Sequence, residues 1–290
     1  MNFRKAFLYD SLGTLSDHDP AFTGSYSGKK QIKPLFKDGL RQLRELQGKL
    51  YAQGKHGLVI ILQAMDAGGK DGIIKHVISG VNPQGCRIRS FSAPSDQELM
   101  HDFMWRCVKE LPARGNIGIF NRSYYEEVLI VRVHPQLLNH QNLPFLEKDQ
   151  PPQEDFWEQR YHDIAHFEKY LSVNGFHVVK FFLNVSKEEQ KKRFLSRIEK
   201  PSKNWKFALS DIEERQHWDD YMEAYQKMLS QTSHTFAPWY VIPADKKWFA
   251  RTAVCHILVD HLDQLQLEYP RVGKEHQQLL EKGRRMLDQE

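Results

Sequence analysis

The sequence predicts an α/β fold in which a five-stranded, mainly parallel sheet is flanked by helices in three layers. Five short apolar runs have the length and composition of buried strands, and helical stretches separate them. This alternation is typical of a parallel sheet with crossover helices. No internal repeat of about 20–50 residues is visible. The expected strands are Gly57–Gln63, Arg87–Phe91, Ile117–Phe120, Val178–Leu183 and Trp239–Ile242.

The chain before the first strand is expected to begin with an irregular N-terminal arm over residues 1–36. Residues 10–34 contain glycine, serine, aspartate and two prolines, which favour loops. Lys37–Gln53 carries leucines at helical spacing and predicts an amphipathic helix. A second helix, over Asp71–Ser79, follows the first strand.

Later helices are recognised by their starts and their apolar stripes. Ser95, Ser186 and Ser210 each precede a glutamate by three residues, which predicts three capping boxes. Aromatic and aliphatic side chains on one stripe predict a helix over Glu154–Val173. The proline-containing residues 138–153 before it are expected to form a loop or a broken element.

The end of the chain predicts two more helices. One is expected to begin after Lys246, to run to about Leu267 and to be ended by Pro270. The other, Lys274–Gln289, is a solvated C-terminal helix within residues 272–290. No linker divides the chain, so we expect one domain with its core at residues 30–265.

Composition excludes several classes of protein. The 290 residues are 40% hydrophobic, and the formal net charge of +4 is too small to indicate nucleic-acid binding by itself. Three scattered cysteines without a CxxC pair suggest neither a disulfide framework nor a zinc site, and a cytoplasmic location is expected. The N-terminal apolar stretch is too short for a signal peptide, and no run reaches the ~18 apolar residues of a membrane span.

The segment after the first strand predicts a phosphate-binding P-loop, residues 64–71. A buried strand, a glycine turn, Lys70 and a helix follow one another in the order that such a loop requires. Backbone N–H groups converge on phosphate oxygens, the helix N-terminus favours negative charge, and the lysine supplies a positive charge. The expected phosphate-binding residues are Ala67, Gly68, Gly69, Lys70, Asp71 and Gly72. The alternative is a strand-to-helix turn whose glycines serve only the backbone.

The loop departs from the usual GxxxxGK[ST] pattern at two positions. Ala64 replaces the first glycine, and Asp71 replaces the hydroxyl residue that normally holds Mg²⁺. Asp66 is a plausible substitute, because Mg²⁺ prefers hard oxygen ligands and an anion beside phosphate-binding amides would otherwise repel the phosphate.

The third strand ends in a second part of the expected site. Asn121 occupies the position of a metal-positioning acid and could ligate the metal or orient its water without adding charge. Arg122 would stabilise charge on the transferring phosphoryl group. The alternative is a helix cap with a surface arginine.

The third part is a basic segment at residues 191–206, with seven basic residues and one acidic residue, a local excess of +6. It predicts a helix–loop–helix lid over about residues 191–210 that closes on a polyanion. A solvated helix face and nucleic-acid binding are the competing explanations of this charge. The lid residues expected to contact the polyanion are Arg193, Arg197, Lys200 and Lys203.

A weaker candidate site follows the second strand. Glu98, Asp102 and Arg106 lie at helical spacings where a nucleotide could be held, although an ordinary surface helix explains them equally well. Glu126, after the third strand, is added to this candidate nucleotide site.

Four sequence blocks resemble the polyphosphate kinase type 2 family. The likeness extends from about residue 30 to about residue 265, with the motifs in family order. The blocks are AMDAGGKDG, IGIFNRSYYEEVLIVRVHP, KRFLSRIEKPSKNWKF and ERQHWDDYMEAYQKML with APWYVIPADKKWFAR.

The resemblance implies a P-loop kinase-like fold with a helical lid and reversible phosphoryl transfer between inorganic polyphosphate and adenine or guanine nucleotides. It implies Mg²⁺ (or Mn²⁺) as cofactor and a homo-oligomer, a dimer or a tetramer. Asp66 and Lys70 fall on the family's loop acid and lysine, Arg122 on the arginine after the third strand, and Arg193 and Arg197 on lid arginines. Asn121, where many members have aspartate, resembles the subgroup that accepts both nucleoside mono- and diphosphates.

Two other functions remain open. A kinase that uses a nucleoside triphosphate to phosphorylate a small molecule would differ in its donor. A non-catalytic polyanion- or RNA-binding protein would retain nucleic acid in a salt-sensitive manner, and the intact acid and lysine of the loop argue against it.

Overall fold

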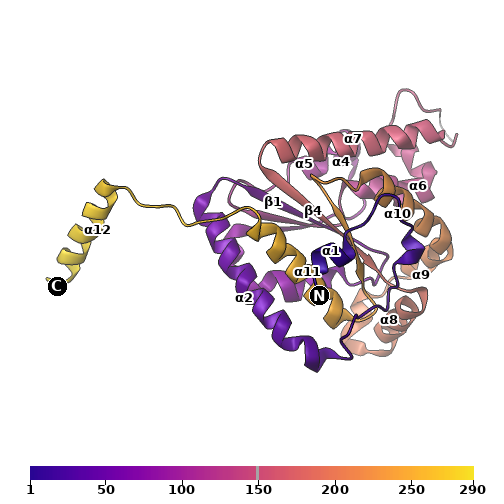
Figure 1. Cartoon of the computed structure of the whole chain (residues 1–290). Helices are drawn as coiled ribbons and strands as arrows, with labels where there is room; N and C mark the ends of the chain where they lie inside the picture. Colours follow the sequence, from indigo (N-terminus) through magenta and orange to yellow (C-terminus); the bar gives the residue numbers. More distant parts are fainter. Residues whose placement is uncertain (148–149) are drawn as a thin grey trace.

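Five parallel strands form one sheet at the centre of the molecule (Figure 1), in the order β2-β3-β1-β4-β5. The structure is a computed structural model that describes residues 1–147 and 150–290, apart from the side chain of Ser79. All strand pairs are parallel, which confirms the predicted fold class. The strands are β1 (Gly57–Gln63), β2 (Cys86–Ser90), β3 (Ile117–Asn121), β4 (Phe176–Asn184) and β5 (Trp239–Pro243).

Strand β1 is central because it pairs with β3 on one side and β4 on the other. All seven of its residues are buried. Because helices cover both faces of the strand, its sequence is a nearly continuous apolar run and does not alternate between apolar and polar residues. Strand β2 lies at the sheet edge, where arginines alternate along an exposed strand and discourage pairing with another chain. The loops that follow β1 and β3 therefore meet at the carboxyl edge of the sheet.

Helices cover both faces of the sheet, which gives the three predicted layers (Figure 1). Helices α2, α3 and α11 pack together on one face, and α7 packs with α10 on the other. These long helices are α2 (Lys29–Gln53), α3 (Lys70–Val77), α7 (Glu154–Val173), α10 (Trp218–Thr232) and α11 (Lys247–Asp263).

Shorter elements connect these layers. After β1 and β2 come η2 (Ile78–Gly80), η3 (Pro83–Gly85), α4 (Asp96–Leu99) and α5 (Trp105–Val108). After β3 come η4 (Tyr124–Val128), α6 (Ile130–Val133) and η5 (Pro135–His140). The lid region contains α8 (Lys187–Glu199), η6 (Pro201–Lys206), α9 (Ser210–Glu214) and η7 (Arg215–His217).

The N-terminal arm is more regular than predicted. Helix α2 begins at Lys29 rather than Lys37 and contains Pro34 in its second turn, where burial of Ile32 compensates for one lost hydrogen bond. A short helix, α1 (Phe3–Phe7), packs Phe3 and Phe7 against the core, and η1 (Leu15–Asp17) follows it. The expectation of an irregular arm over residues 1–36 is wrong for these parts, because tertiary packing outweighs the local loop signals.

The three predicted capping boxes have three different outcomes. Ser95 and Glu98 form a complete box. Ser186 accepts from the N–H of Glu189, but its own N–H donates to Asp245 instead of to Glu189. Ser210 is the first residue of α9 and makes no capping hydrogen bond, so the prediction there is wrong.

The last two helices differ from the prediction only in where they end. Helix α11 ends at Asp263, before the predicted stop, and α12 (Lys274–Leu287) has no buried residue, as expected of a solvated helix. Figure 1 shows α12 standing away from the body of the protein. Within the predicted loop at residues 138–153, Lys148 and Asp149 lie outside the described residues. No helix in the described ranges is both long and apolar enough to cross a membrane.

Candidate active site

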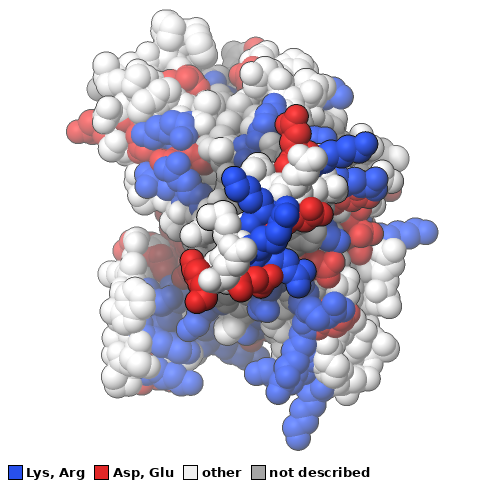
Figure 2. All heavy atoms as spheres, turned by 90° about the vertical axis from the view of Figure 1, so that its left-hand side faces the viewer, with Lys and Arg blue, Asp and Glu red and all other residues white. Residues whose placement is uncertain are grey.

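A cavity of about 1010 Å³ opens at the carboxyl edge of the sheet, between the phosphate loop, the ends of β2 and β3, the lid and α11. Its lining is strongly basic, with ten basic side chains against the three acidic ones of Asp66, Asp71 and Glu189. Positive charge is also unevenly spread on the surface, where Lys and Arg outnumber acidic side chains in the lower half of Figure 2. The basic residues of the cavity are Lys70, Arg122, Lys192, Arg193, Arg197, Lys200, Lys203, Lys206, Lys247 and Arg251.

The phosphate loop, residues 64–71, joins the end of β1 to the first turn of α3. Ala67 and Gly69 have left-handed backbone conformations, with φ of 58° and 115°. Gly68 has no room for a side chain, since a Cβ there would lie 2.6 Å from the Cβ of Ala64. The glycines thus allow a tight turn that ordinary residues would not adopt.

The tight turn leaves several backbone donors open toward an anion. Among the described residues, no hydrogen bond uses the N–H groups of Gly69, Lys70 or Asp71. These are the first donors of α3, where the helix dipole also favours negative charge. The structure therefore brings together the backbone groups that the sequence assigns to phosphate binding.

Lys70 is held inside the loop, with 9% of its surface exposed. Its Nζ donates to the carbonyl of Ala64 at 2.6 Å, the residue that replaces the first glycine of the pattern. Burial and the neighbouring Arg122 lower the pKa of Lys70 from its usual value, whereas Asp66 acts in the opposite direction. An incoming phosphate would supply the negative charge that this buried ammonium lacks.

Asp66 and Arg122 form an ion pair across the ends of β1 and β3. The Nη2 of Arg122 lies 2.6 Å from Oδ1 of Asp66, and Arg122 has a left-handed backbone with φ of 64°. Burial raises the pKa of Asp66, but Lys70 and Arg122 outweigh burial and hold the pKa below its usual value. Asp66 is therefore a carboxylate between two cations.

A buried polar cluster behind the site fixes the segment that follows Arg122. The hydroxyls of Tyr124 and Tyr125 both donate to Glu168, at 2.9 and 2.8 Å. Lys180 on β4 completes the cluster with an ion pair of 2.5 Å to Glu168. Since a buried charge pair is stable only when its groups are fully hydrogen-bonded, this cluster firmly locates η4 and the arginine before it.

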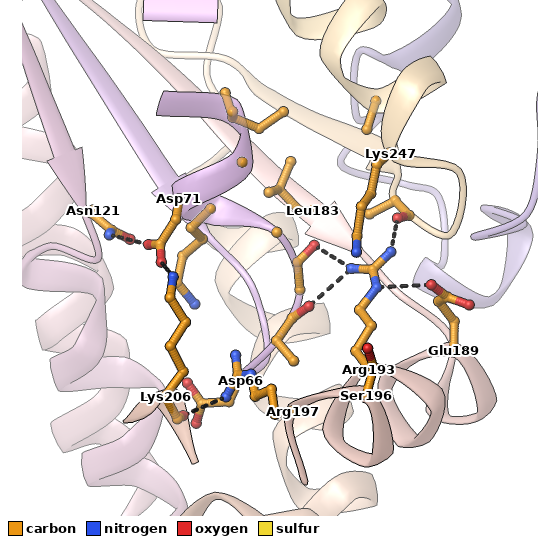
Figure 3. A pocket seen from close by; sticks show the side chains of 18 of the residues that line it. Asp66, Asp71, Asn121, Leu183, Glu189, Arg193, Ser196, Arg197, Lys206 and Lys247 are labelled. Atoms are coloured by element: carbon orange, nitrogen blue, oxygen red, sulfur yellow. Dashed lines mark hydrogen bonds and ion pairs between the residues drawn. The ribbon is translucent and has the colours of Figure 1, made fainter. Parts of the chain in front are cut away.

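Asn121 links the loop helix to the lid. Its Nδ2 donates to Asp71 at 3.2 Å, and the other carboxylate oxygen of Asp71 lies 3.2 Å from Nζ of Lys206 in η6 (Figure 3). The Oδ1 of Asn121 is buried and accepts no hydrogen bond from the described residues. A buried oxygen without a donor suits a cation or a metal-bound water.

The residues present fit a divalent cation that is shared with phosphates. Asp66 offers a carboxylate and Asn121 an unpartnered oxygen, both on the cavity wall. The described residues contain no cluster of three or more His, Cys, Asp or Glu side chains that could hold a metal alone. Mg²⁺ typically binds one or two protein oxygens and completes its shell with substrate phosphates and water, which matches this sparse set.

The four predicted lid residues differ in whether the cavity or the protein backbone takes up their side-chain donors. Arg197, Lys200 and Lys203 line the cavity, as the sequence predicts, and Nη1 of Arg197 lies 2.9 Å from Asp211. Arg193 also borders the cavity, but it is 7% exposed and donates to backbone carbonyls of the loop. The sequence places both arginines on one helix face, yet it gives no sign that Arg193 is bound inside the protein.

The candidate nucleotide residues after β2 are not brought to the cavity. Glu98 caps Ser95 and lies 3.5 Å from Arg106, whose guanidinium also donates to the carbonyl of Ser92. Asp102 accepts from the N–H of Met104. Two short helices replace the single helix that the spacing suggested, and their polar side chains hold this local fold.

Glu126 interacts electrostatically with residues of the phosphate loop and with Arg122. Burial raises its pKa, while Arg122 and Lys70 act in the opposite direction. Glu126 is therefore within electrostatic reach of Arg122 and Lys70, but it does not line the cavity.

Sequence reasoning missed several cavity residues, among them Lys247 and Arg251 on the first turns of α11. Burial, with Arg193 nearby, lowers the pKa of both side chains. Their spacing of four residues directly after β5 was a usable signal, because the carboxyl ends of parallel strands carry binding sites. Lys192 and Lys206 also line the cavity; they belong to the predicted basic segment but were not among the four lid residues expected to contact the polyanion.

Known proteins are similar to this chain in both sequence and fold. The family model described as Polyphosphate kinase 2 matches residues 27–270. An ADP-polyphosphate phosphotransferase of Rhodopseudomonas palustris is 51% identical over 245 residues, 84% of each chain. An AMP/ADP-polyphosphate phosphotransferase of Meiothermus ruber is 45% identical over 257 residues, 88% of this chain and 91% of the relative.

A solved structure agrees with these matches. The crystal structure of Polyphosphate Kinase 2 from Arthrobacter aurescens TC1 superimposes with a TM-score of 0.87, at 41% identity, and covers 97% of both chains. The matched residues include the loop after β1, the end of β3, the lid and the start of α11. The chain belongs to the polyphosphate kinase 2 family.

Proposed function

We propose that the chain transfers a phosphoryl group between inorganic polyphosphate and a nucleotide, converting AMP or ADP to ADP or ATP in a reversible reaction. The observation that carries this proposal is the cavity in which ten basic side chains surround one phosphate loop. A linear polyanion can use most of these charges along its length, whereas a small neutral substrate would leave them unpaired. The names of the relatives from Rhodopseudomonas palustris and Meiothermus ruber support the same donor and acceptors.

The phosphate loop and Arg122 hold the reacting phosphates. The open N–H groups of Gly69, Lys70 and Asp71 would bind phosphate oxygens near the bond that breaks, and the Lys70 ammonium would offset their charge. Arg122 is fixed beside the loop and would stabilise charge that develops on the transferring group.

Asp66 and Asn121 would hold Mg²⁺ (or Mn²⁺) in this reaction. When bound, the cation would neutralise charge on the phosphate oxygens. Asp66 is kept ionised by Lys70 and Arg122, and the buried Oδ1 of Asn121 offers a second oxygen.

The rest of the polyphosphate chain would extend along the lid and α11. Arg197, Lys200 and Lys203 line one side of the cavity, and Lys247 and Arg251 line another. A polyphosphate chain between the lid and α11 would have cations on both sides of several of its phosphates. The nucleotide would then approach from the side of Arg122.

The chemistry needs little from the protein beyond positioning and charge. A terminal phosphate oxygen of the nucleotide attacks the terminal phosphorus of the polyphosphate chain. A new P–O bond forms, the adjacent P–O–P link breaks, and the shortened chain leaves with the electron pair. Backbone amides, Lys70 and Arg122 stabilise the charge on the three equatorial oxygens.

The decisive experiment supplies ADP, long-chain polyphosphate and Mg²⁺ to the purified chain and no other donor. ATP should form in step with the loss of polyphosphate phosphate, and AMP in a parallel reaction should yield ADP. Absence of ATP, together with phosphorylation of a small molecule by added ATP, would overturn the proposal in favour of a nucleoside-triphosphate-dependent kinase.

We also propose that the protein works in the cytoplasm as a dimer or tetramer. Its three cysteines are free thiols, which suits a reducing compartment. Light scattering after size-exclusion chromatography measures the assembly directly, and a monomer at micromolar concentration would contradict it.

A further inference from the structure

Two side chains of α8 donate hydrogen bonds to three successive carbonyl oxygens of the phosphate loop. The Nε2 of Gln190 donates to the carbonyl of Asp66 at 3.0 Å. The Nη1 of Arg193 donates to the carbonyls of Ala67 and Gly68 at 2.9 and 3.0 Å (Figure 3). We call Gln190 and Arg193 together the carbonyl clamp.

Arg193 uses its whole donor set inside the protein. Its Nε donates to Glu189 at 2.9 Å, and its Nη2 donates to the carbonyls of Ala244 and Asp245 at 2.5 and 3.3 Å. With the two loop carbonyls, these contacts account for all five N–H groups of a guanidinium. The side chain is almost entirely buried, so it has no donor left for a substrate.

Gln190 is equally constrained. It is 1% exposed, and its Oε1 accepts from Nη1 of Arg215 at 2.7 Å. This contact sets the orientation of the amide, because the oxygen must face the arginine and the nitrogen must then face Asp66.

We propose that the carbonyl clamp is a positioning device that keeps the amides of the phosphate loop directed at the substrate. A peptide unit is planar, so a carbonyl that is held on one side forces the next N–H to the other side. Fixing the carbonyl of Gly68 thereby directs the N–H of Gly69 away from α8, and that N–H is one of the open donors. Without the clamp, a carbonyl could turn toward the cavity and repel the phosphate.

The loop needs such a clamp because its conformation is strained. Ala67 is a non-glycine residue in the left-handed region, and conformations of this kind persist only where surrounding contacts enforce them. The clamp supplies contacts on both carbonyls that flank Gly68. Lysine cannot replace the arginine in this role, since one ammonium cannot reach two separated pairs of carbonyls in fixed directions.

The clamp also ties α8 to the turn before α11. Asp245, whose carbonyl meets Arg193, accepts with its side chain from the N–H and the hydroxyl of Ser186, both at 2.8 Å. The start of α8, the turn at Ala244–Asp245 and the loop thus form a closed ring of hydrogen bonds. Arg193 belongs to the fixed wall of the site, whereas Arg197, Lys200 and Lys203 beyond it line the cavity.

The test compares R193K and Q190M with the exposed neighbour K191Q, which does not line the cavity. Three quantities are measured on the full-length protein. They are the dissociation constant of pyrophosphate by calorimetry, hydrogen exchange of a peptide that spans residues 64–72, and kcat with KM for ADP and polyphosphate. The last quantity rests on the proposed function, and the first two do not.

For R193K we expect ~10-fold or weaker pyrophosphate binding, faster exchange at residues 64–72 and a loss of roughly 100-fold in kcat/KM, because small misplacements of binding groups cost that much. Q190M should change the same quantities in the same direction by a smaller factor, and K191Q should match the wild type.

Loss of kcat in R193K with unchanged pyrophosphate affinity and exchange would overturn the proposal, since Arg193 would then act on the transition state directly. Full activity of R193K would overturn it as well. If R193K does not fold, Q190M decides by the same measurements, and unchanged exchange in Q190M contradicts the clamp. A wild-type protein that makes no ATP would refute the proposed function, while pyrophosphate binding and exchange would still test the clamp.

Discussion

The inner and outer halves of residues 190–206 differ in what their side-chain donors contact. In the inner half, Gln190 and Arg193 donate to backbone carbonyls of the phosphate loop, and only Lys192 of its other basic residues lines the cavity. In the outer half, residues 197–206, the basic side chains line the cavity or pair with single carboxylates. Positive charge alone therefore does not reveal which residues meet the substrate. A better guide is the number of protein acceptors around each donor, because a donor that the protein already uses has no hydrogen bond left for the substrate.

The largest effect is expected from D66N, which changes the side chain of Asp66 and leaves its backbone carbonyl in the clamp. D66N keeps the backbone contact with Gln190 but removes the anion that would bind Mg²⁺, so turnover should fall at least ~1,000-fold. The measurement is steady-state ATP synthesis, with circular dichroism to show that the fold is retained.

D71N is the matched control for this prediction, because Asp71 contacts the outer half through Lys206. It should lose far less activity than D66N. Equal losses in the two variants would contradict the assignment of the metal to Asp66.

The next effect concerns Arg197, one turn beyond the clamp. R197Q removes a cation that lines the cavity, and a charge-assisted contact of ~1.5–3 kcal/mol corresponds to a KM for polyphosphate that rises roughly 10- to 100-fold. The KM for ADP should change much less. If both KM values rose together, Arg197 would not be specific to the polyphosphate side, and the contrast between the two halves would weaken.

Salt should distinguish the two halves further. Exposed cations of the outer half are screened at high ionic strength, whereas the buried clamp is not. Between about 50 and about 300 mM NaCl, screening should therefore raise the KM for polyphosphate several-fold. The rate of hydrogen exchange at residues 64–72 should stay constant over the same range. An exchange rate that increases with salt would show that surface charge holds the loop.

The smallest effect is expected at the contact between Lys206 and Asp71. Both side chains are well exposed, at 39% and 70%, so K206M should change the free energy of unfolding by less than ~1 kcal/mol. Thermal denaturation measures this change, and the KM for polyphosphate should rise only a few-fold. A large loss of stability would mean that the lid is an integral part of the folded core.

The sequence was sufficient for the sheet because its strands are buried apolar runs with little ambiguity. All five strands were located within about two residues, and the loop at Ala64–Asp71 was found from its order of strand, glycine, lysine and helix. The start of α2 was missed because Pro34 is a strong local signal for a loop. Packing of Ile32 in the core overrides it.

Parts of the site could not be predicted from local patterns. The role of Arg193 depends on carbonyls that lie more than fifty residues away on both sides of it in the sequence. Lys247 and Arg251 reach the cavity only because β5 is placed beside β4 in the sheet. Such contacts follow from topology, which a single sequence specifies only indirectly.

The left-handed backbone of Arg122 has a consequence for how the protein can evolve. A non-glycine residue in this conformation costs roughly 1 kcal/mol, which glycine at the same position would recover. That replacement would also remove the guanidinium beside Asp66. The backbone cost at this one position is therefore tolerated together with the ion pair, and a lineage that no longer needed the reaction would be free to replace the arginine.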